Sequence, residues 1–323
     1  MHVKTIDEPL PLRQLNTLLS RLPKNASWRK LIEEDLAKRK AGLTGENSLD
    51  YYLPFLDQND FIFQDLRLPT GSTFVQMDLL ILTPAFILIG EVKNIAGTVT
   101  FDSKFQQFYR TYRDQEQTLP NPLFQVQRQK NRLLQWLQEN RYPIVPILSL
   151  ILFTDSRTRI LAPDSFQSST LPTIGHAEIL PSTVETLKKQ YPKTKLRPQT
   201  TNRLVEQLLK SHRPQRIAVM EKFGVTCADL IKGILCPTCK TGIMVRFGRS
   251  WKCPNCAEVD RTAHVHAIQD YAWLIKNEAT NQELRHFLNI SSRHVMKKLI
   301  HSMHLSLKEP YKSGKNNIYI IPD

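Results

Sequence analysis

Two long apolar runs separated by a short turn constrain the fold of this chain more than any other feature. The first run, FVQMDLLIL, covers residues 74–82, and the second, FILIGEVKN, covers residues 86–94. Both runs are rich in Ile, Leu and Val, which is typical of strands buried inside a sheet. A Thr-Pro-Ala turn joins them, so we predict a buried antiparallel hairpin.

Charged residues lie at the open end of this hairpin. Folding it symmetrically about its turn places Leu80 opposite Ile89 and Asp78 opposite Glu91, and strand alternation puts Lys93 on the face of Glu91. Like charges that face each other across two strands destabilise a sheet unless another group neutralises them. A salt bridge centred on Lys93 or a bound divalent cation would do so, and the pattern leaves both open.

The segments around the hairpin complete an α/β core. A strand is expected before it at residues 61–68, and a long helix at 123–140 is followed by an apolar strand at 144–153. Two further helices are expected at residues 28–40 and 46–56. The order strand, strand, strand, helix, strand predicts an α/β fold.

The arrangement D-x12-E-V-K on consecutive strands resembles the PD-(D/E)XK nucleases. More specifically, residues 41–155 are similar to the nuclease-related domain, NERD, in the segments GENSLDYYL, DLRLP, QMDLLIL, IGEVKN and NPLFQVQRQ, which occur in the order of that family. The resemblance implies a restriction-endonuclease-like core, a mixed sheet flanked by helices. This chain departs from the family in offering Phe105 and Phe108 where a tryptophan often follows the EVKN-G segment, which affects packing rather than chemistry.

The resemblance also implies catalytic roles for Glu46, Asp78, Glu91, Lys93 and Gln125. Asp78 and Glu91 would bind Mg²⁺ or Mn²⁺, and Lys93 would stabilise charge or orient a water molecule during phosphodiester hydrolysis. Glu46 would add an outer ligand and Gln125 would position water or backbone. An alternative for Glu46 is a solvated acid at a helix N-terminus, where the helix dipole favours negative charge.

Four of the five cysteines form a doubled CxxC motif. The residues are Cys236 and Cys239, then thirteen intervening residues, then Cys253 and Cys256. Four thiolates in two such pairs complete a tetrahedral coordination shell, so we predict a structural zinc site rather than a catalytic one. Cys227 is left over and is expected to be a small buried thiol.

Two C-terminal modules carry the candidate nucleic-acid contacts. Arg249 and Trp251 belong to a basic and aromatic cluster on the zinc ribbon, which either contacts phosphate and bases or forms a solvated face. Beyond it, a helix, a turn, a second helix and a basic hairpin are similar to a winged helix-turn-helix, whose second helix would present Arg293, Lys297 and Lys298 to DNA. The alternative is a packed helical pair with its lysines in solvent.

Net charge restricts the partners. The chain has a formal net charge of +14, which attracts polyanions. No apolar stretch approaches the ~18–20 residues that span a bilayer, so we expect no membrane partner and a cytoplasmic protein. The expected organisation is a basic arm (1–40), the NERD domain (41–155), a connector with helices (156–230), a zinc ribbon (231–264) and a small winged-helix-like α+β module (265–323).

The sequence favours a metal-dependent nuclease whose partner is nucleic acid, with DNA preferred. One alternative is a non-catalytic nucleic-acid-binding or regulatory protein that retains a nuclease fold, and another is a scaffold that recruits proteins through its ribbon. A single phosphate-cutting centre per chain would need a homodimer, or two successive events, to break both strands of a duplex.

Overall fold

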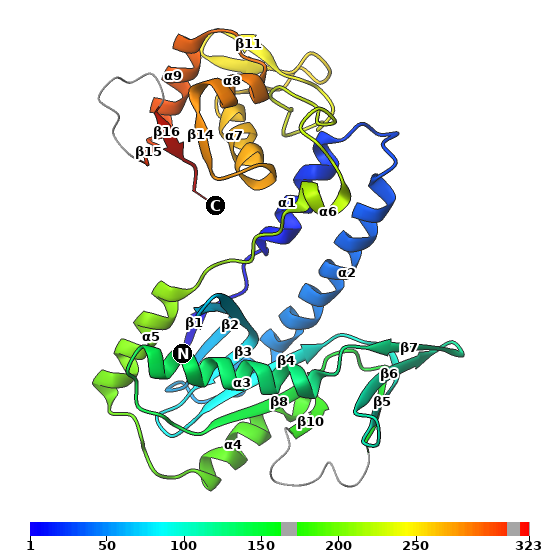
Figure 1. The fold of residues 1–323 in the computed structure, drawn as a ribbon, viewed down its shortest axis with the longest axis vertical. Helices are drawn as coiled ribbons and strands as arrows, with labels where there is room; N and C mark the ends of the chain where they lie inside the picture. Colours follow the sequence, from blue (N-terminus) through cyan, green and yellow to red (C-terminus); the bar gives the residue numbers. More distant parts are fainter. Residues whose placement is uncertain (163–172, 309–316, 323) are drawn as a thin grey trace. The chain divides into compact units, whose positions relative to one another are not determined.

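The computed structural model describes residues 1–162, 173–308 and 317–322. The chain divides into two compact units. The first contains Met1–Asp7 and Arg39–Pro214, and the second contains Glu8–Lys38 and Gln215–Asp323. Figure 1 shows the elements of each unit.

The first unit is built on a six-stranded mixed sheet. Its strand order is β1-β2-β3-β4-β8-β10, in which β2, β3 and β4 are antiparallel and the pairs β1–β2, β4–β8 and β8–β10 are parallel. The strand, hairpin and apolar strand predicted from the sequence are its centre. The strands are β1 (His2–Lys4), β2 (Phe61–Thr70), β3 (Thr73–Leu82), β4 (Ile87–Lys93), β8 (Ile147–Phe153) and β10 (Thr173–His176).

Helices pack on both faces of this sheet because its strands are apolar on both sides. One hydrophobic cluster joins Leu80 and Leu82 to Trp136 of α3 and Leu208 of α5. A second joins residues of the opposite face, such as Leu79, to the 3₁₀ helices and α4. The fold is therefore a mixed sheet flanked by helices. These elements are α3 (Pro122–Glu139), α5 (Pro198–Ser211), α4 (Leu180–Gln190), η1 (Ser48–Tyr51), η2 (Leu53–Phe55) and η4 (Ala177–Ile179).

A second, four-stranded sheet is built mainly from residues 97–119, where the sequence predicted no helix or strand. It has the order β7-β6-β5-β9, and its buried side joins Phe101 and Phe108 to Phe153 of β8. Of the two phenylalanines that stand for the family's tryptophan, Phe108 is buried and Phe105 is 66% exposed. The strands are β5 (Gly97–Asp102), β6 (Gln107–Tyr112), β7 (Gln115–Leu119) and β9 (Thr158–Leu161).

Two predicted helices differ in the structure. The helix expected at 28–40 is α2 (Arg29–Asn47), which continues through Gly42 and Gly45. The helix expected at 46–56 is wrong, because α2 ends at Asn47, η1 and η2 are short 3₁₀ turns, and Pro54 prevents a continuous α-helix there.

The second unit packs helices around the cysteine-rich segment and a small sheet. One three-stranded sheet has the order β11-β12-β13 and the other the order β14-β16-β15. Cys227 lies exposed in a turn, which corrects the expectation of a buried thiol. The elements are α1 (Leu10–Arg21), α6 (Val219–Phe223), β11 (Val245–Phe247), β12 (Ser250–Lys252), β13 (Val259–Asp260), α7 (Ala263–Leu274), β14 (Glu278–Thr280), α8 (Asn281–Leu288), α9 (Arg293–Ser302), β15 (Ser306–Leu307) and β16 (Ile318–Ile320).

A buried arginine fastens this unit together. The Arg21 side chain is fully buried and pairs with Asp270 of α7, at 2.7 Å between Nη2 and Oδ2. Its Nη1 donates to the carbonyl oxygens of Ile231 and Gly233, and its guanidinium lies 4.5 Å from the ring centroid of Phe287. Because its charge is paired and its Nε and Nη1 atoms have acceptors, the burial of this cation is tolerated.

Within the ranges that the structure describes, no helix combines the length and the apolar composition needed to cross a bilayer.

Candidate active site and candidate metal centre

The hairpin has the predicted register. Leu80 pairs with Ile89, and the ladder between β3 and β4 ends at the pair Leu79↔Gly90. Beyond it, Oδ2 of Asp78 accepts a hydrogen bond from the backbone N–H of Val92 at 2.8 Å. A side-chain oxygen thus replaces a backbone carbonyl where the two strands part, and this fixes the position of the Asp78 carboxylate.

Both oxygens of the Glu91 carboxylate are engaged. Nζ of Lys93 donates to Oε1 at 2.6 Å, and Nε2 of Gln129 donates to Oε2 at 2.6 Å. Glu91 is only 5% exposed. The salt bridge centred on Lys93 that the sequence left open is therefore present, and it holds Glu91 in one orientation.

Glu46 approaches from the end of α2. It lies in the last turn of that helix, so the alternative of a solvated acid at a helix N-terminus is wrong. The preceding Gly45 makes this approach possible, because a Cβ at residue 45 would lie 2.5 Å from Cβ of Asn94. Nδ2 of Asn94 in turn donates to the carbonyl oxygen of Ala41 at 2.8 Å, which ties α2 to the end of β4.

Electrostatics show that Glu46, Asp78 and Glu91 act on one another, and we call these three residues the acidic cluster. Burial raises the pKa of Glu46 from 4.5 to about 7, and the charges of Asp65 and Glu91 act in the same direction. Burial also raises the pKa of Asp78 well above its usual range, helped by the charges of Glu91 and Glu46. Lys93 opposes these effects without cancelling them. The raised pKa values favour the protonated forms of Glu46 and Asp78, so ionising the whole acidic cluster is unfavourable with the nearby lysines as the compensating charge.

Helix α3 adds two glutamines one turn apart. Asn121 caps its N-terminus by accepting from the N–H of Leu123, which fixes where the helix begins. Gln125 and Gln129 are both partly buried, and the Oε1 atom of each is buried without a hydrogen-bond partner in the described chain. Gln129 contacts Glu91 directly, whereas the sequence singled out Gln125. The four-residue spacing on one helix face was the signal that would have found Gln129.

Asp65 is a further carboxylate near this group. Its backbone has a φ of 49°, a left-handed conformation that interrupts β2. Its Oδ1 accepts from Nε2 of Gln76 at 2.8 Å, and burial raises its pKa while the charge of Lys4 lowers it. Asp65 begins the DLRLP segment but was given no role from the sequence.

The acidic cluster and the cysteines differ as metal sites. Among the described residues, the four cysteines are the one group of three or more His, Cys, Asp or Glu whose ligand atoms all lie within 4.8 Å of one another. Asp78 and Glu91 offer hard carboxylate oxygens of the kind that Mg²⁺ and Mn²⁺ prefer. These donors fit a divalent cation at the acidic cluster, whose charge would favour the ionised forms of the acids.

Residues 41–154 match the family model of the nuclease-related domain. The chain carries a NERD domain. The matched segment contains all three members of the acidic cluster, together with Lys93 and both glutamines. No curated protein and no solved structure matches the chain at a significant level.

Outside the NERD domain, the cysteines form two similar turns. In each turn, the backbone carbonyl oxygen of the first cysteine accepts a hydrogen bond from the backbone N–H four residues later. Lys240 donates to Cys236 and Ala257 donates to Cys253, both at 3.0 Å. Both donor residues have a left-handed backbone conformation. The Sγ atoms of Cys236 and Cys256, and those of Cys239 and Cys253, lie 3.6 Å apart. Tetrahedral ligands at about 2.3 Å from zinc lie about 3.8 Å from one another. The cluster is therefore compatible with a zinc ribbon.

The ribbon turns Trp251 inward. Trp251 is 4% exposed, and its indole N–H donates to Nδ1 of His264 at 3.3 Å. This corrects the expectation that Trp251 stacks on a base, because residues alternate along β12 and the inner side of the strand carries the ring. Arg246 lies 4.9 Å from the Trp251 ring centroid, and Arg249 is exposed.

The outer face of the same sheet carries the exposed aromatic residue. Val245 pairs with Lys252, and Lys252 pairs with Val259, so these side chains share a face with Phe247. Phe247 is 58% exposed, Val245 is 56% exposed and Val259 is 48% exposed. Nζ of Lys252 lies 5.4 Å from the Phe247 ring centroid. The residue pattern of these short strands does not indicate which face of the sheet is the inner one.

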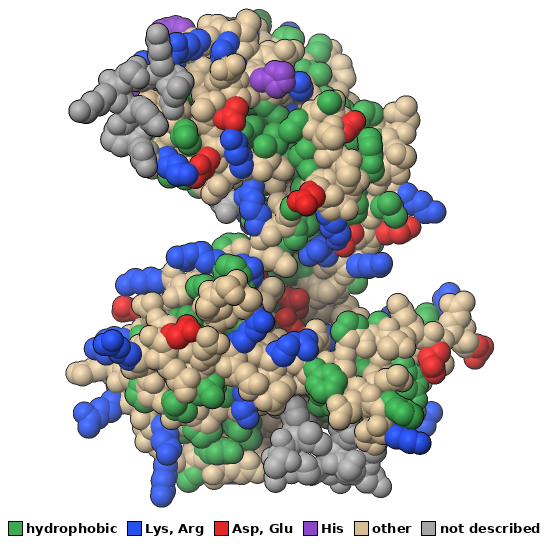
Figure 2. Space-filling view, in the orientation of Figure 1, with side chains coloured by type: hydrophobic (Ala, Val, Ile, Leu, Met, Phe, Trp, Pro, Cys, Tyr) green, Lys and Arg blue, Asp and Glu red, His purple; other side chains and the backbone are tan. Residues whose placement is uncertain are grey.

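The helix pair α8 and α9 forms as predicted. Ser292 caps α9 by accepting from the N–H of Val295, and Arg293, Lys297 and Lys298 are all exposed on α9. Strands β15 and β16 pair antiparallel after α9, and most of the basic segment expected between them, residues 309–316, lies outside the described residues. On the face drawn in Figure 2, Lys and Arg side chains are spread over both units with fewer Asp and Glu between them.

Proposed function

We propose that the NERD domain is a divalent-metal-dependent nuclease that hydrolyses phosphodiester bonds, with DNA as the favoured substrate. The observation that carries this proposal is the acidic cluster, in which Glu46 and Asp78 have raised pKa values beside a lysine that reaches Glu91. Such a concentration of buried acids is costly without a cation, and strongly perturbed groups gather at functional sites. A purely structural ion pair would need only Glu91 and Lys93.

Each residue has a role that follows from its contacts. Asp78 and Glu91 would hold Mg²⁺ or Mn²⁺, which supplies Lewis-acid polarisation of the phosphate and activates water. Gln129 and Lys93 keep Glu91 oriented, and Lys93 is the cation placed to stabilise charge that develops on phosphate oxygens. Glu46 provides a carboxylate that changes protonation near neutral pH.

Gln125 would act as a positioning group. Its Oε1 atom is buried and has no partner in the described chain, so it is available to accept from a water molecule or from a nucleotide. Because α3 is anchored by its N-cap at Asn121, this oxygen is held in place rather than free to move with a loop.

The test is a cleavage assay with linear DNA, circular DNA and RNA, each with Mg²⁺, Mn²⁺ or EDTA. Asp78→Asn keeps an oxygen that can accept from Val92, so it removes charge with little damage to the strand end. Glu91→Gln and Lys93→Ala complete the set, and Glu116→Gln, an exposed acid of β7, is the matched control. Cutting that requires metal, survives in Glu116→Gln and falls at least a hundredfold in the others supports the proposal.

Equal cutting by the wild type and all four variants would refute the nuclease assignment. If none of the proteins cuts while all bind DNA with a strong salt dependence, the alternative of a non-catalytic nucleic-acid-binding protein takes its place. Active enzyme that nicks one strand at a time would argue for successive events, and activity rising with protein concentration as dimers form would argue for a homodimer.

For the second unit we propose a structural zinc ion held by the four cysteines and a nucleic-acid-binding role. The two similar cysteine turns and the 3.6 Å separations between their sulfur atoms support the zinc ion. Phe247 beside Lys252 offers a ring for a base and a cation for a phosphate, which replaces the inward-facing Trp251 as the stacking residue. Arg249 on the ribbon and the exposed Arg293, Lys297 and Lys298 of a winged-helix-like module would contact the phosphate backbone.

A further inference from the structure

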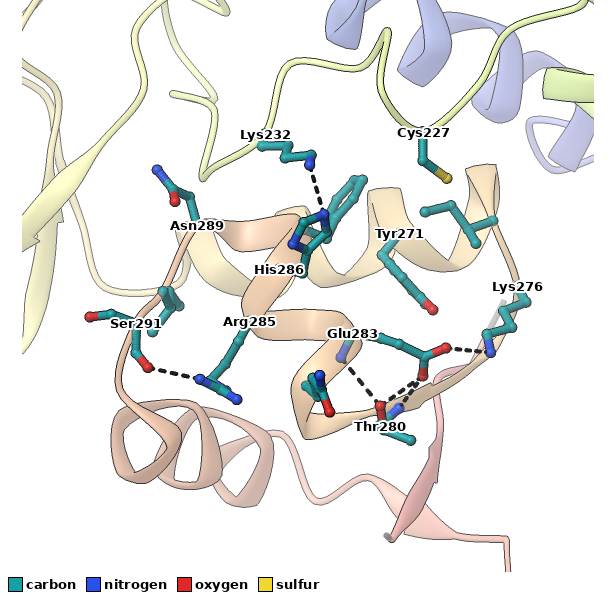
Figure 3. Close-up of a pocket in the computed structure, with 14 residues that line it drawn as sticks. Cys227, Lys232, Tyr271, Lys276, Thr280, Glu283, Arg285, His286, Asn289 and Ser291 are labelled. Carbon is teal, nitrogen blue, oxygen red and sulfur yellow. Dashed lines mark hydrogen bonds and ion pairs between the residues drawn. The ribbon is translucent and has the colours of Figure 1, made fainter.

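A pocket of about 870 Å³ opens in the second unit, between α7, α8 and the segment that follows α6. Figure 3 shows Lys232 beside His286 along one part of it, Tyr271 and Lys276 along another, and the Arg285 side chain directed from α8 towards Ser291. None of the four cysteines and none of the exposed basic residues of α9 lines it. The pocket is therefore separate from the other candidate sites of this unit.

Two basic groups of the pocket lack an acidic partner. Nζ of Lys232 lies 2.7 Å from Nε2 of His286, so the lysine donates and the imidazole nitrogen accepts. In the described chain, neither Lys232 nor Arg285 forms an ion pair with a carboxylate. Arg285 donates from Nη1 to the carbonyl oxygen of Ser291 at 2.9 Å, and its Nε is buried without a hydrogen-bond partner in the described residues. The lysine and the imidazole thus lie together at one part of the pocket, and the arginine belongs to another part of its lining.

The one carboxylate that lines the pocket is already committed. Oε2 of Glu283 accepts from the N–H and the hydroxyl of Thr280 at 2.7 and 2.9 Å, which closes a capping box at the start of α8. Nζ of Lys276 lies 2.6 Å from Oε1 of Glu283 and neutralises its charge. Since Glu283 and Lys276 cancel, the charge that Lys232 and Arg285 bring to the pocket is not balanced.

The remaining wall is apolar and aromatic. Ile275, Phe287 and Ile290 line the pocket together with Tyr271, which packs edge to face against Phe287 at 5.4 Å between ring centroids. The volume lies in the roughly 300–1,000 Å³ range of small-molecule sites. A ligand that matches this wall has an anionic group for the basic side and a flat, partly apolar group for the other.

We propose that this pocket binds the phosphate-bearing end of a nucleotide, with Lys232 and His286 contacting the phosphate. Phosphate oxygens accept from both side chains, and they take the place of the histidine as the partner of Lys232. The base and sugar lie against the apolar wall. The ligand is either a free mononucleotide or the 5′-phosphorylated terminus of a nucleic acid, which have this chemistry in common.

The experiment measures binding to the full chain loaded with zinc, by calorimetry for AMP and inorganic phosphate and by fluorescence anisotropy for one oligonucleotide with a 5′-phosphate and the same one with a 5′-hydroxyl. Lys232→Ala and His286→Ala are the test variants. Arg285 is left intact, because its bond to Ser291 holds the turn before α9. Lys24→Ala, an exposed lysine of the same unit outside the pocket, is the charge-matched control.

Binding of AMP that falls about tenfold or more in both variants, but not in Lys24→Ala, supports the site and assigns it to free nucleotides. A preference for the 5′-phosphate that the same two variants abolish supports the site and assigns it to chain ends. If Lys232→Ala and His286→Ala bind every probe as the wild type does, the proposal is overturned. Melting temperature and zinc content verify that each variant is folded, and no cleavage is measured, so the result is independent of the nuclease proposal.

Discussion

The acidic cluster makes a quantitative prediction for Glu46→Gln. Its pKa of about 7 in the folded chain, against an ordinary value of 4.5, means that ionising this residue opposes folding. Each pKa unit corresponds to about 1.4 kcal/mol, so the penalty above pH 7 is at most about 3 kcal/mol. Because the side chain remains partly exposed, solvent screening reduces the expected value to about 2 kcal/mol.

The sign and the pH window follow from proton linkage. Below about pH 4.5 both folded and unfolded states hold the proton, and the residue contributes nothing. As pH rises towards 7 the unfolded state ionises first, so the free energy of unfolding falls and stays lower above that pH. Glutamine cannot ionise. We therefore expect Glu46→Gln to be more stable than the wild type at pH 8 and to keep only about a quarter of that gain at pH 5.

Equilibrium denaturation at both pH values measures this difference, with Glu116→Gln as the exposed control. Comparing variant with wild type at each pH cancels the titration of all other groups. Added Mg²⁺ is expected to shrink the gain at pH 8, because the cation stabilises the ionised wild type. A stability difference of the same size at pH 5 and pH 8 would show that packing, and not ionisation, causes it, and would refute the reasoning.

Three further predictions concern single contacts. Cys253→Ser should lower the zinc content of the purified protein from about one ion per chain and destabilise the second unit. Full zinc retention in a colorimetric release assay would contradict the four-cysteine site. Gln129→Ala should lower the Mg²⁺-dependent cleavage rate about tenfold, because Glu91 loses a charged hydrogen bond, and an unchanged rate would limit Gln129 to packing. Phe247→Ala should weaken binding of single-stranded DNA by about tenfold, whereas Trp251→Phe should not, because the Trp251 side chain is buried. Equal effects of the two substitutions in anisotropy titrations would oppose a stacking role for Phe247.

The central hairpin was predictable because two features determined it together. Apolar runs of similar length and a short turn leave one symmetric register, and Leu80 pairs with Ile89 as that register requires. The family resemblance was predictable for the same reason, since its segments lie on these strands. The NERD match at residues 41–154 agrees with it closely.

Other features depend on tertiary contacts that periodicity does not report. Strand β7 is polar and mostly exposed and β6 is mostly half-buried, so their pairing rather than their pattern defines them. Gly42 and Gly45 read as a break, yet α2 continues through both and carries Glu46 at its far end. Trp251 could have faced either way on a three-residue strand, and only packing against His264 decides it.

The space at Gly45 bears on how this chain can change. There is room for one hydrogen atom where any other residue would put a carbon 2.5 Å from Cβ of Asn94 and 2.9 Å from Oγ1 of Thr154. Neither neighbour is the loose tip of a long side chain, so a larger residue would force α2 away from β4. Gly45 and Glu46 thus act together, because the glycine sets how closely α2 approaches β4 and so where the Glu46 carboxylate lies; a substitution that keeps the acid but fills the gap at residue 45 would displace that carboxylate.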